Sequence, residues 1–165
     1  MKTVVELLHE GAKNHGDMPY LGGKTDNGWV TFNFKEVDRL SSVFAAMLIK
    51  KGFKKGENIS ILSEGRPSWV ICEFGLLKAG CTSVPLSTKL SEDEIVFRLD
   101  HSESKAFLVS ENNFQKAVTA LKTARSKPVL IVISDKNEAL AGDNVLFYDD
   151  LILEGEKLLS QESEY

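Results

Sequence analysis

Two hydrophobic periods alternate along the chain, one typical of buried strands and the other typical of amphipathic helices. Short, apolar and nearly uncharged runs indicate strands that are covered on both faces, and they lie at 58–62, 82–84, 106–109, 129–133 and 144–147. Between them, apolar residues recur at helical spacing, which predicts helices at 33–50, 91–100, 111–124 and 149–159 and another that begins at Pro67. Strands that alternate with helices predict an α/β fold with an open, mostly parallel sheet and helices on both faces.

The segment from 65 to 86 is the part around which we expect the fold to be organised. Nearly every residue from Trp69 to Leu77 is apolar, so this helix should be buried on most of its sides. It should end at Gly80, which can adopt the left-handed conformation. Pro85 should end the strand that follows, because proline cannot donate to a sheet. With the strand at 58–62, this predicts a βαβ unit in the middle of the parallel sheet.

Two helix starts carry a capping box. In this motif, an N-cap side chain and a glutamate three residues later each accept a hydrogen bond from the backbone N–H of the other residue. The pairs are Asn33 with Glu36 and Ser91 with Glu94. The first helix should end at Gly52 and turn one apolar stripe toward the sheet, formed by Val37, Leu40, Phe44, Met47 and Leu48. We therefore interpret Glu36 as a capping residue and not as a catalytic carboxylate.

The two ends of the chain predict smaller features. A helix at 3–14 should bury one side, formed by Val4, Leu7 and Leu8. Strands at 20–24 and 29–32 flank an Asn-Gly turn, which predicts a small antiparallel hairpin that forms a flap on the edge of the main sheet. The polar tail at 160–165 should be frayed.

Composition narrows the class of protein. The 165 residues are enough for one domain, and a net charge of −4 argues against a nucleic-acid partner. The sequence has no membrane span or signal peptide, so we expect a cytoplasmic protein, compatible with peripheral membrane association and with a homodimer. Cys72 and Cys81 could form one disulfide or remain as two buried thiols, and we expect the thiols in a reducing compartment.

Three stretches resemble a known family, in that family's order. The run 77–86, Leu-Lys-Ala-Gly-Cys-Thr-Ser-Val-Pro-Leu, resembles the second core motif of the adenylate-forming enzymes, which include acyl-CoA synthetases, luciferases and adenylation domains. Residues 33–37 resemble the first core motif, and 51–59 resemble the loop and strand between the two. Residues 66–69 and 90–95 are most similar to the long-chain fatty acyl-CoA synthetase branch.

This resemblance implies a fatty acid, ATP, Mg²⁺ and coenzyme A as the substrates and cofactors of a full-length enzyme. It also implies that the active site lies elsewhere, because the family's Ser/Thr/Gly-rich phosphate loop and catalytic lysine are missing from these 165 residues, and 147–151 resemble the segment just before that loop. We therefore interpret 1–165 as the N-terminal subdomain of a long-chain fatty acid–CoA ligase, inactive by itself. A truncated, non-catalytic relative is the other interpretation.

One loop is a candidate binding site, and we identify no catalytic residue and no metal site. Ser87, Thr88 and Lys89 follow the strand at 82–84, and relatives that bind coenzyme A use the corresponding loop near its nucleotide portion. A plain structural loop is the simpler interpretation. His9, His15 and His101 lack partners at metal-ligand spacing, and Arg66 is expected at the surface of a helix start.

A stand-alone binding module, such as a receiver or flavodoxin-like domain, is the rival hypothesis. A receiver needs adjacent acidic residues after its first strand, but Leu62 is followed by Ser-Glu-Gly. A flavodoxin needs a hydroxyl-rich phosphate loop there, where Glu64 would repel phosphate. Both patterns are missing.

Overall fold

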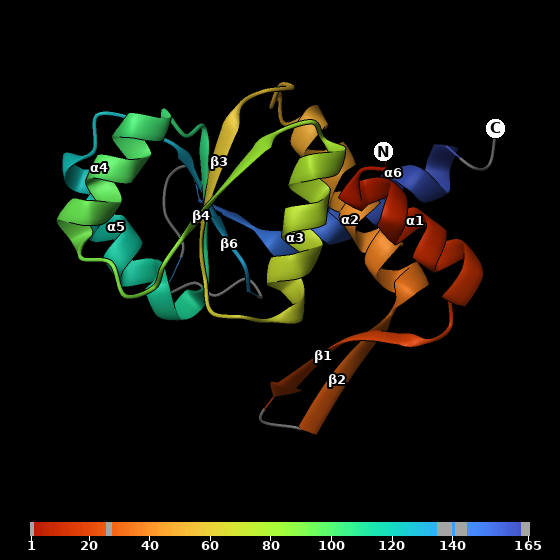
Figure 1. Cartoon of the computed structure of the whole chain (residues 1–165). Coiled ribbons are helices and arrows are strands. Elements are labelled where there is room, and N and C mark those ends of the chain that lie inside the picture. Colours follow the sequence, from red (N-terminus) through yellow and green to blue (C-terminus); the bar gives the residue numbers. More distant parts are fainter. Residues whose placement is uncertain (1, 26–27, 135–139, 141–144, 163–165) are drawn as a thin grey trace.

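The computed structural model describes residues 2–25, 28–134, 140 and 145–162. Figure 1 shows a parallel sheet flanked by helices, with a small hairpin that projects from one end. The elements in chain order are α1 (Val4–His15), β1 (Pro19–Thr25), β2 (Gly28–Asn33), α2 (Phe34–Lys50), β3 (Asn58–Leu62), α3 (Pro67–Lys78), β4 (Thr82–Leu86), α4 (Glu92–Ser102), β5 (Ala106–Val109), a 3₁₀ turn (Glu111–Asn113), α5 (Phe114–Thr123), β6 (Val129–Val132), β7 (Val145–Phe147) and α6 (Tyr148–Glu162).

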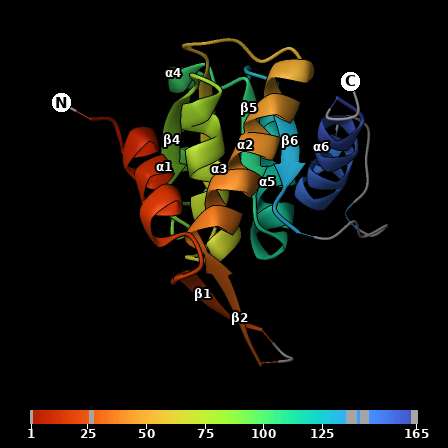
Figure 2. The same cartoon turned by 90° about the vertical axis from the view of Figure 1, so that its right-hand side faces the viewer.

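The main sheet confirms the predicted fold class. Its five described strands are all parallel and have the order β4-β3-β5-β6-β7. Helices α2, α3 and α6 cover one face, with α1 beside α2, and α4 and α5 cover the other face (Figure 2). Side chains of each strand alternate between the two layers: Ile59 and Ile61 belong to the core under α2 and α3, whereas Leu62 belongs to the core under α4 and α5.

The βαβ unit β3-α3-β4 forms as predicted, but not in the middle of the sheet. No residue of α3 is exposed, and Gly80 has the left-handed φ of 76°. However, β5 takes the free side of β3, so β4 is an edge strand among the described residues. The strand also does not end at Pro85, which lies opposite Ile61 and is followed by the strand residue Leu86. An edge strand tolerates proline, because one side of it has no hydrogen-bonding partner.

Helix α1 forms as predicted but buries a different side. Leu8 and Ala12 are its buried residues, whereas Val4 and Leu7 each keep 54% of their surface exposed. The expected grouping of Val4 and Leu7 with Leu8 was therefore wrong. The helix packs on α2 along the line from Leu8 to Ala12, and that line leaves Val4 and Leu7 turned away from the core.

The hairpin is a separate two-stranded sheet and not a flap on the edge of the main sheet. Its tip residues 26 and 27, which include the asparagine of the predicted Asn-Gly turn, lie outside the described residues, whereas Gly28 begins β2. Its contacts with the body include a ring stack and a close approach to α3. The Tyr20 and Phe34 rings stack with centroids 4.2 Å apart, and a Cβ on Gly23 would come within 2.8 Å of Pro67, so only glycine allows this approach.

Most local predictions are confirmed. Both capping boxes form: Asn33 accepts a bond from the backbone N–H of Glu36 at 2.8 Å, and Ser91 pairs with Glu94 in the same way. The predicted α2 stripe faces the core, with Leu40 only partly buried. Cys72 and Cys81 are free and buried. The predicted helix at 111–124 begins with a 3₁₀ turn, α6 extends to Glu162, and Asn144 and 163–165 lie outside the described residues.

Candidate functional site

The carboxyl ends of the parallel strands meet at one edge of the sheet, on the side from which the hairpin projects (Figure 1). The chain leaves β3, crosses through α3 to β4 on one side, and later places β5 on the other side of β3. Such a reversal of strand order opens a crevice between the two loops that leave β3 and β5, and ligands of open α/β sheets bind in such crevices. The loops here are 63–66 and 110–113.

Side chains of the protein itself close this crevice. Arg66 donates to both carboxylate oxygens of Glu111, at 2.6 and 2.8 Å, and to the carbonyl of Ile133 at 2.9 Å. The hydrogen bonds that Arg66 donates to Glu111 raise the pKa of Arg66 despite its partial burial. The contact therefore joins the ends of β3, β5 and β6 through a bidentate ion pair, whose geometry is specific to arginine.

A second polar contact lies beside the first. The Asn113 side-chain amide donates to Glu64 Oε1 at 2.8 Å and to Ser110 Oγ at 2.7 Å. Burial pushes the pKa of Glu64 upward, but hydrogen bonds from Ser110, from its own backbone and from Asn113, together with the charge of Arg66, hold it below its ordinary value. A carboxylate that stays ionised here disfavours any phosphate in the crevice.

A cleft of about 490 Å³ lies next to the ion pair, between the hairpin, α3 and the start of α6. Its size is in the range of small-molecule pockets. Seven of its lining side chains are apolar: Val30, Phe32, Leu40, Pro67, Ile71, Ile133 and Ile152. Lys24, Arg66 and Asp149 supply charge at the lining, and burial raises the pKa of the Tyr148 phenol, which keeps it neutral. The cleft is therefore suited to an apolar group.

The predicted loop Ser87-Thr88-Lys89 also lies at this carboxyl edge, at the end of the edge strand β4. Ser87 and Lys89 are exposed and Thr88 is half-buried. Lys116 of α5 fixes the loop, because its ammonium donates to the carbonyls of Thr88 at 2.9 Å and Leu90 at 3.1 Å. No ion pair among the described residues involves Lys89. Its ammonium is thus accessible, and a role at a coenzyme A site stays a prediction.

The other residues that the sequence singled out have structural contacts. His9 lies 3.2 Å from Asp38, and His101 stacks on Phe97. Within the described part of the chain, no group of three or more potential metal-ligating side chains occurs, and no helix is long and apolar enough to cross a bilayer. Arg66 is not the surface residue that we expected. Neither its pairing with Glu111 nor the contact of Lys116 has a local sequence signal, because the partners are far apart in the chain.

Comparisons with known proteins converge on one family. The model of the AMP-binding enzyme family matches residues 8–157. Human long-chain-fatty-acid–CoA ligase 1 is 29% identical over 140 residues, which cover 81% of this chain and 20% of that protein. The ligase heimdall of Drosophila melanogaster is 26% identical over 125 residues, which cover 73% of this chain and 18% of that protein. The chain thus spans about a fifth of the length of these curated relatives.

Solved structures show the same fold. The coronafacic acid ligase of Pectobacterium brasiliense superposes with a TM-score of 0.82 at 22% identity, over 92% of this chain and 29% of that chain. The adenylation domain of a carboxylate reductase from Mycobacterium chelonae gives a TM-score of 0.81 at 20% identity, over 93% and 28%.

Proposed function

The chain belongs to the AMP-binding enzyme family, and we propose that it is the N-terminal subdomain of a long-chain fatty acid–CoA ligase. The observation that carries this proposal is the family match over nearly the whole chain, combined with relatives about five times as long. The names of the curated relatives favour a long-chain fatty acid over other acids. Family membership decides against the stand-alone receiver or flavodoxin-like module.

The proposed parent reaction has two steps. A carboxylate attacks the α-phosphate of ATP and releases pyrophosphate, and the thiol of coenzyme A then displaces AMP from the acyl-adenylate. The described residues do not form a magnesium site, and the closed crevice with its ionised Glu64 does not suit the phosphates of ATP. We therefore assign the chemistry of both steps to other parts of the parent protein.

Two roles are left for this chain in the proposal. The first is to support the parent fold, through a carboxyl edge that the Arg66–Glu111 pair holds together. The second is the loop Ser87-Thr88-Lys89, where Lys89 would offer its ammonium to a phosphate of coenzyme A and Lys116 would act as a positioning residue. A cytoplasmic location and a homodimer stay predictions.

The test is to extend the chain along the reading frame of its parent gene. We expect the frame to continue into a Ser/Thr/Gly-rich loop that ends in Pro-Lys-Gly. The extended protein should form acyl-CoA from palmitate faster than from acetate or benzoate. A frame that stops at Tyr165 would overturn the fragment assignment, and a preference for acetate or benzoate would overturn the long-chain assignment.

A further inference from the structure

The outer side of β4 is an open edge of the main sheet. Strand β4 pairs in parallel with β3 along its whole length, from Thr82 opposite Asn58 to Leu86 opposite Leu62. Among the described residues, no strand pairs with its other side. An open edge presents unpaired backbone N–H and C=O groups, which are a template for a strand of another chain. The groups that β4 presents therefore decide whether a second chain can pair with it.

Backbone direction divides the residues of β4 into two sets. Thr82 donates its N–H to the carbonyl of Glu57 at 2.9 Å, so its backbone faces β3. The backbone groups of alternate residues point to the same side of a strand, so Ser83 and Pro85 face the open side. Proline has no N–H. Within β4, Ser83 therefore keeps the single outward N–H, and an incoming strand loses one of two donor positions.

Packing in the core does not explain the proline. The side chain of Pro85 is exposed. Proline is also depleted in strands, because it fixes φ and cannot donate to a sheet. The N–H that it lacks would face the open side, so the pairing of β3 with β4 is intact. Pro85 therefore changes what the edge can bind and leaves the sheet itself unchanged.

Without Pro85, the sequence of this segment would favour strand pairing. Residues 79–88 carry no charge, and their strand contains the β-branched residues Thr82 and Val84 and the apolar Leu86. Windows of about five to seven residues with high β-propensity, low charge and no proline are typical of segments that associate edge to edge. Pro85 lies inside such a window and interrupts it.

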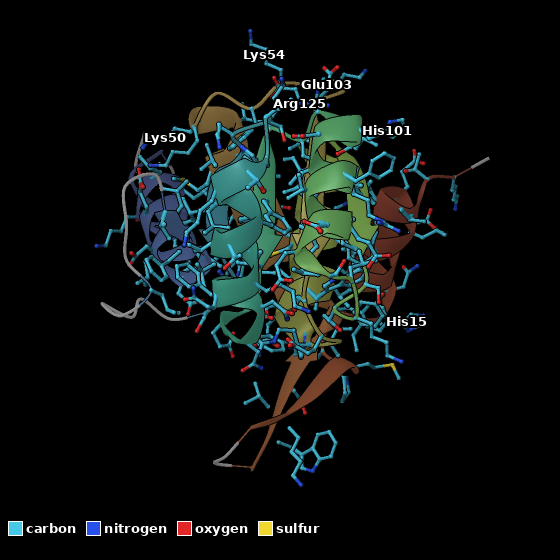
Figure 3. The ribbon with its side chains drawn as sticks, turned by 90° about the vertical axis from the view of Figure 1, so that its left-hand side faces the viewer. His15, Lys50, Lys54, His101, Glu103 and Arg125 are labelled. Carbon is cyan, nitrogen blue, oxygen red and sulfur yellow. The ribbon has the colours of Figure 1, made fainter. Side chains whose placement is uncertain are left out.

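Charged residues flank the same segment at both ends. Lys78 and Lys89 border it in the sequence. At its amino end, Gly56 donates its N–H to the carbonyl of Gly80 at 2.8 Å, which brings the loop before β3 next to the start of β4. Figure 3 shows Lys54 of this loop at the end of the molecule opposite the hairpin. Flanking charges, like an edge proline, limit strand pairing in natural proteins.

The other edge of the described sheet is protected by its length. Strand β7 has three residues, Val145–Phe147, and α6 follows directly. Very short edge strands offer few groups for pairing, whereas β4 has five residues. We propose that Pro85 closes the β4 edge to strand addition and thereby prevents two copies of the chain from joining their sheets there. A homodimer then requires another surface.

The variant Pro85→Thr tests this proposal, because it restores the outward N–H on a β-prone residue. We expect sedimentation equilibrium to give a self-association constant at least about tenfold above that of the parent chain. Hydrogen exchange should locate the contact, since the amides at positions 83 and 85 should exchange more slowly between about 5 µM and about 500 µM protein. Pro85→Ala restores the same N–H with a lower β-propensity, so it should change both measurements in the same direction but less.

The variant Thr82→Val is the matched control. It makes the same strand more apolar, but the N–H at position 82 already pairs with Glu57, so self-association should stay within about twofold of the parent chain. Equal association of Thr82→Val and Pro85→Thr would overturn the proposal, because apolar side chains would then explain the effect.

Three further results would also overturn it. One is a pair of folded position-85 variants, checked by circular dichroism, whose exchange does not depend on concentration. Another is slower exchange at Ser83 in the concentrated parent chain, which would show that the edge is already open. The last is failure of both variants to fold, which would show that the fold itself requires Pro85. The measurements need no ATP or acyl substrate, so they are independent of the proposed ligase function.

Discussion

The two ends of the parallel sheet use charge in opposite ways. At the carboxyl edge, the charged residues nearest the crevice are partly buried and contact other side chains: Arg66 pairs with Glu111, and Glu64 accepts a hydrogen bond from Asn113 on one of its two oxygens. At the amino edge, Lys54, Lys55 and Lys105 are exposed. The charged residues of the carboxyl edge therefore stabilise the fold, whereas the lysines of the amino edge are accessible to solvent or to a partner.

Topology is one cause of this difference. In a parallel α/β sheet, the crossover helices begin at the carboxyl edge and end at the amino edge, so their dipoles point the same way. Acidic residues accordingly occupy first turns, as in α4 with Glu92, Asp93 and Glu94, and basic residues occupy last turns, as in α2 with Lys50. The parallel arrangement thus separates charge even in a chain whose composition is mixed.

The largest effect is expected at the amino edge, from Gly80→Val. Gly80 has a φ of 76°, and a Cβ there would lie 3.1 Å from Lys55 Cγ. A β-branched residue in this conformation should lower the free energy of unfolding by roughly 1–3 kcal/mol. Chemical denaturation measures it. A curve that coincides with that of the parent chain would show that the left-handed turn is not required.

At the carboxyl edge, Arg66→Ala should cost somewhat less, roughly 1–2 kcal/mol. The change leaves Glu111 without its bidentate partner, but both side chains are partly exposed, at 27% and 36%, so solvent offsets part of the loss. Arg66→Lys should restore only part of the stability, because lysine cannot bind both oxygens in the same plane. Denaturation of Arg66→Ala, Glu111→Gln and the double variant would give the coupling energy. Strictly additive losses would contradict the role of this pair.

A smaller effect is expected for Lys89→Ala, and it concerns binding. An exposed ammonium contributes up to about 1 kcal/mol to an ion pair, so the Michaelis constant for coenzyme A should rise by about twofold to fivefold in the extended ligase. The adenylation half-reaction should be unchanged. A fall in adenylation, or no change in either step, would show that the loop is only structural.

The smallest difference is expected in the acid response of Glu64→Gln. Because the pKa of Glu64 is held below its ordinary value of 4.5, its ionised form stabilises the fold above that pH. This contribution is lost as the pH falls below 4.5 through the lowered pKa. The free energy of unfolding of the variant should therefore fall less steeply with acid than that of the parent chain. Parallel profiles between pH 3 and 6, measured in urea, would contradict the assignment.

The features that could be predicted from the sequence depend on local contacts, whereas those that could not be predicted depend on contacts between residues far apart in the chain. Capping boxes such as Asn33–Glu36 and the turn at Gly80 depend on residues within one or two helical turns, so they could be read directly. The exposed side of α1 could not, because Val4, Leu7 and Leu8 are equally apolar and only the position of α2 selects Leu8. The partners Arg66 and Glu111 are 45 positions apart, and no local pattern joins them.

The edge position of β4 is an intermediate case. Thr82, Ser83 and Pro85 make this the most polar of the predicted strands, and proline is typical of edges. These residues were a usable signal for an edge strand. The whole βαβ unit was predicted in the middle of the sheet because its helix α3 is apolar, and α3 does belong to the core.

The central proposal is that this chain is a non-catalytic part of an acid–CoA ligase. Pyrophosphate release tests it most directly, with the purified 165-residue chain, ATP, magnesium, palmitate and coenzyme A. We expect background release from this chain and turnover from the protein extended along its reading frame. Turnover above background by the chain alone would contradict this proposal. The turnover would have to be proportional to the concentration of the chain and to be absent from a mock preparation made without it.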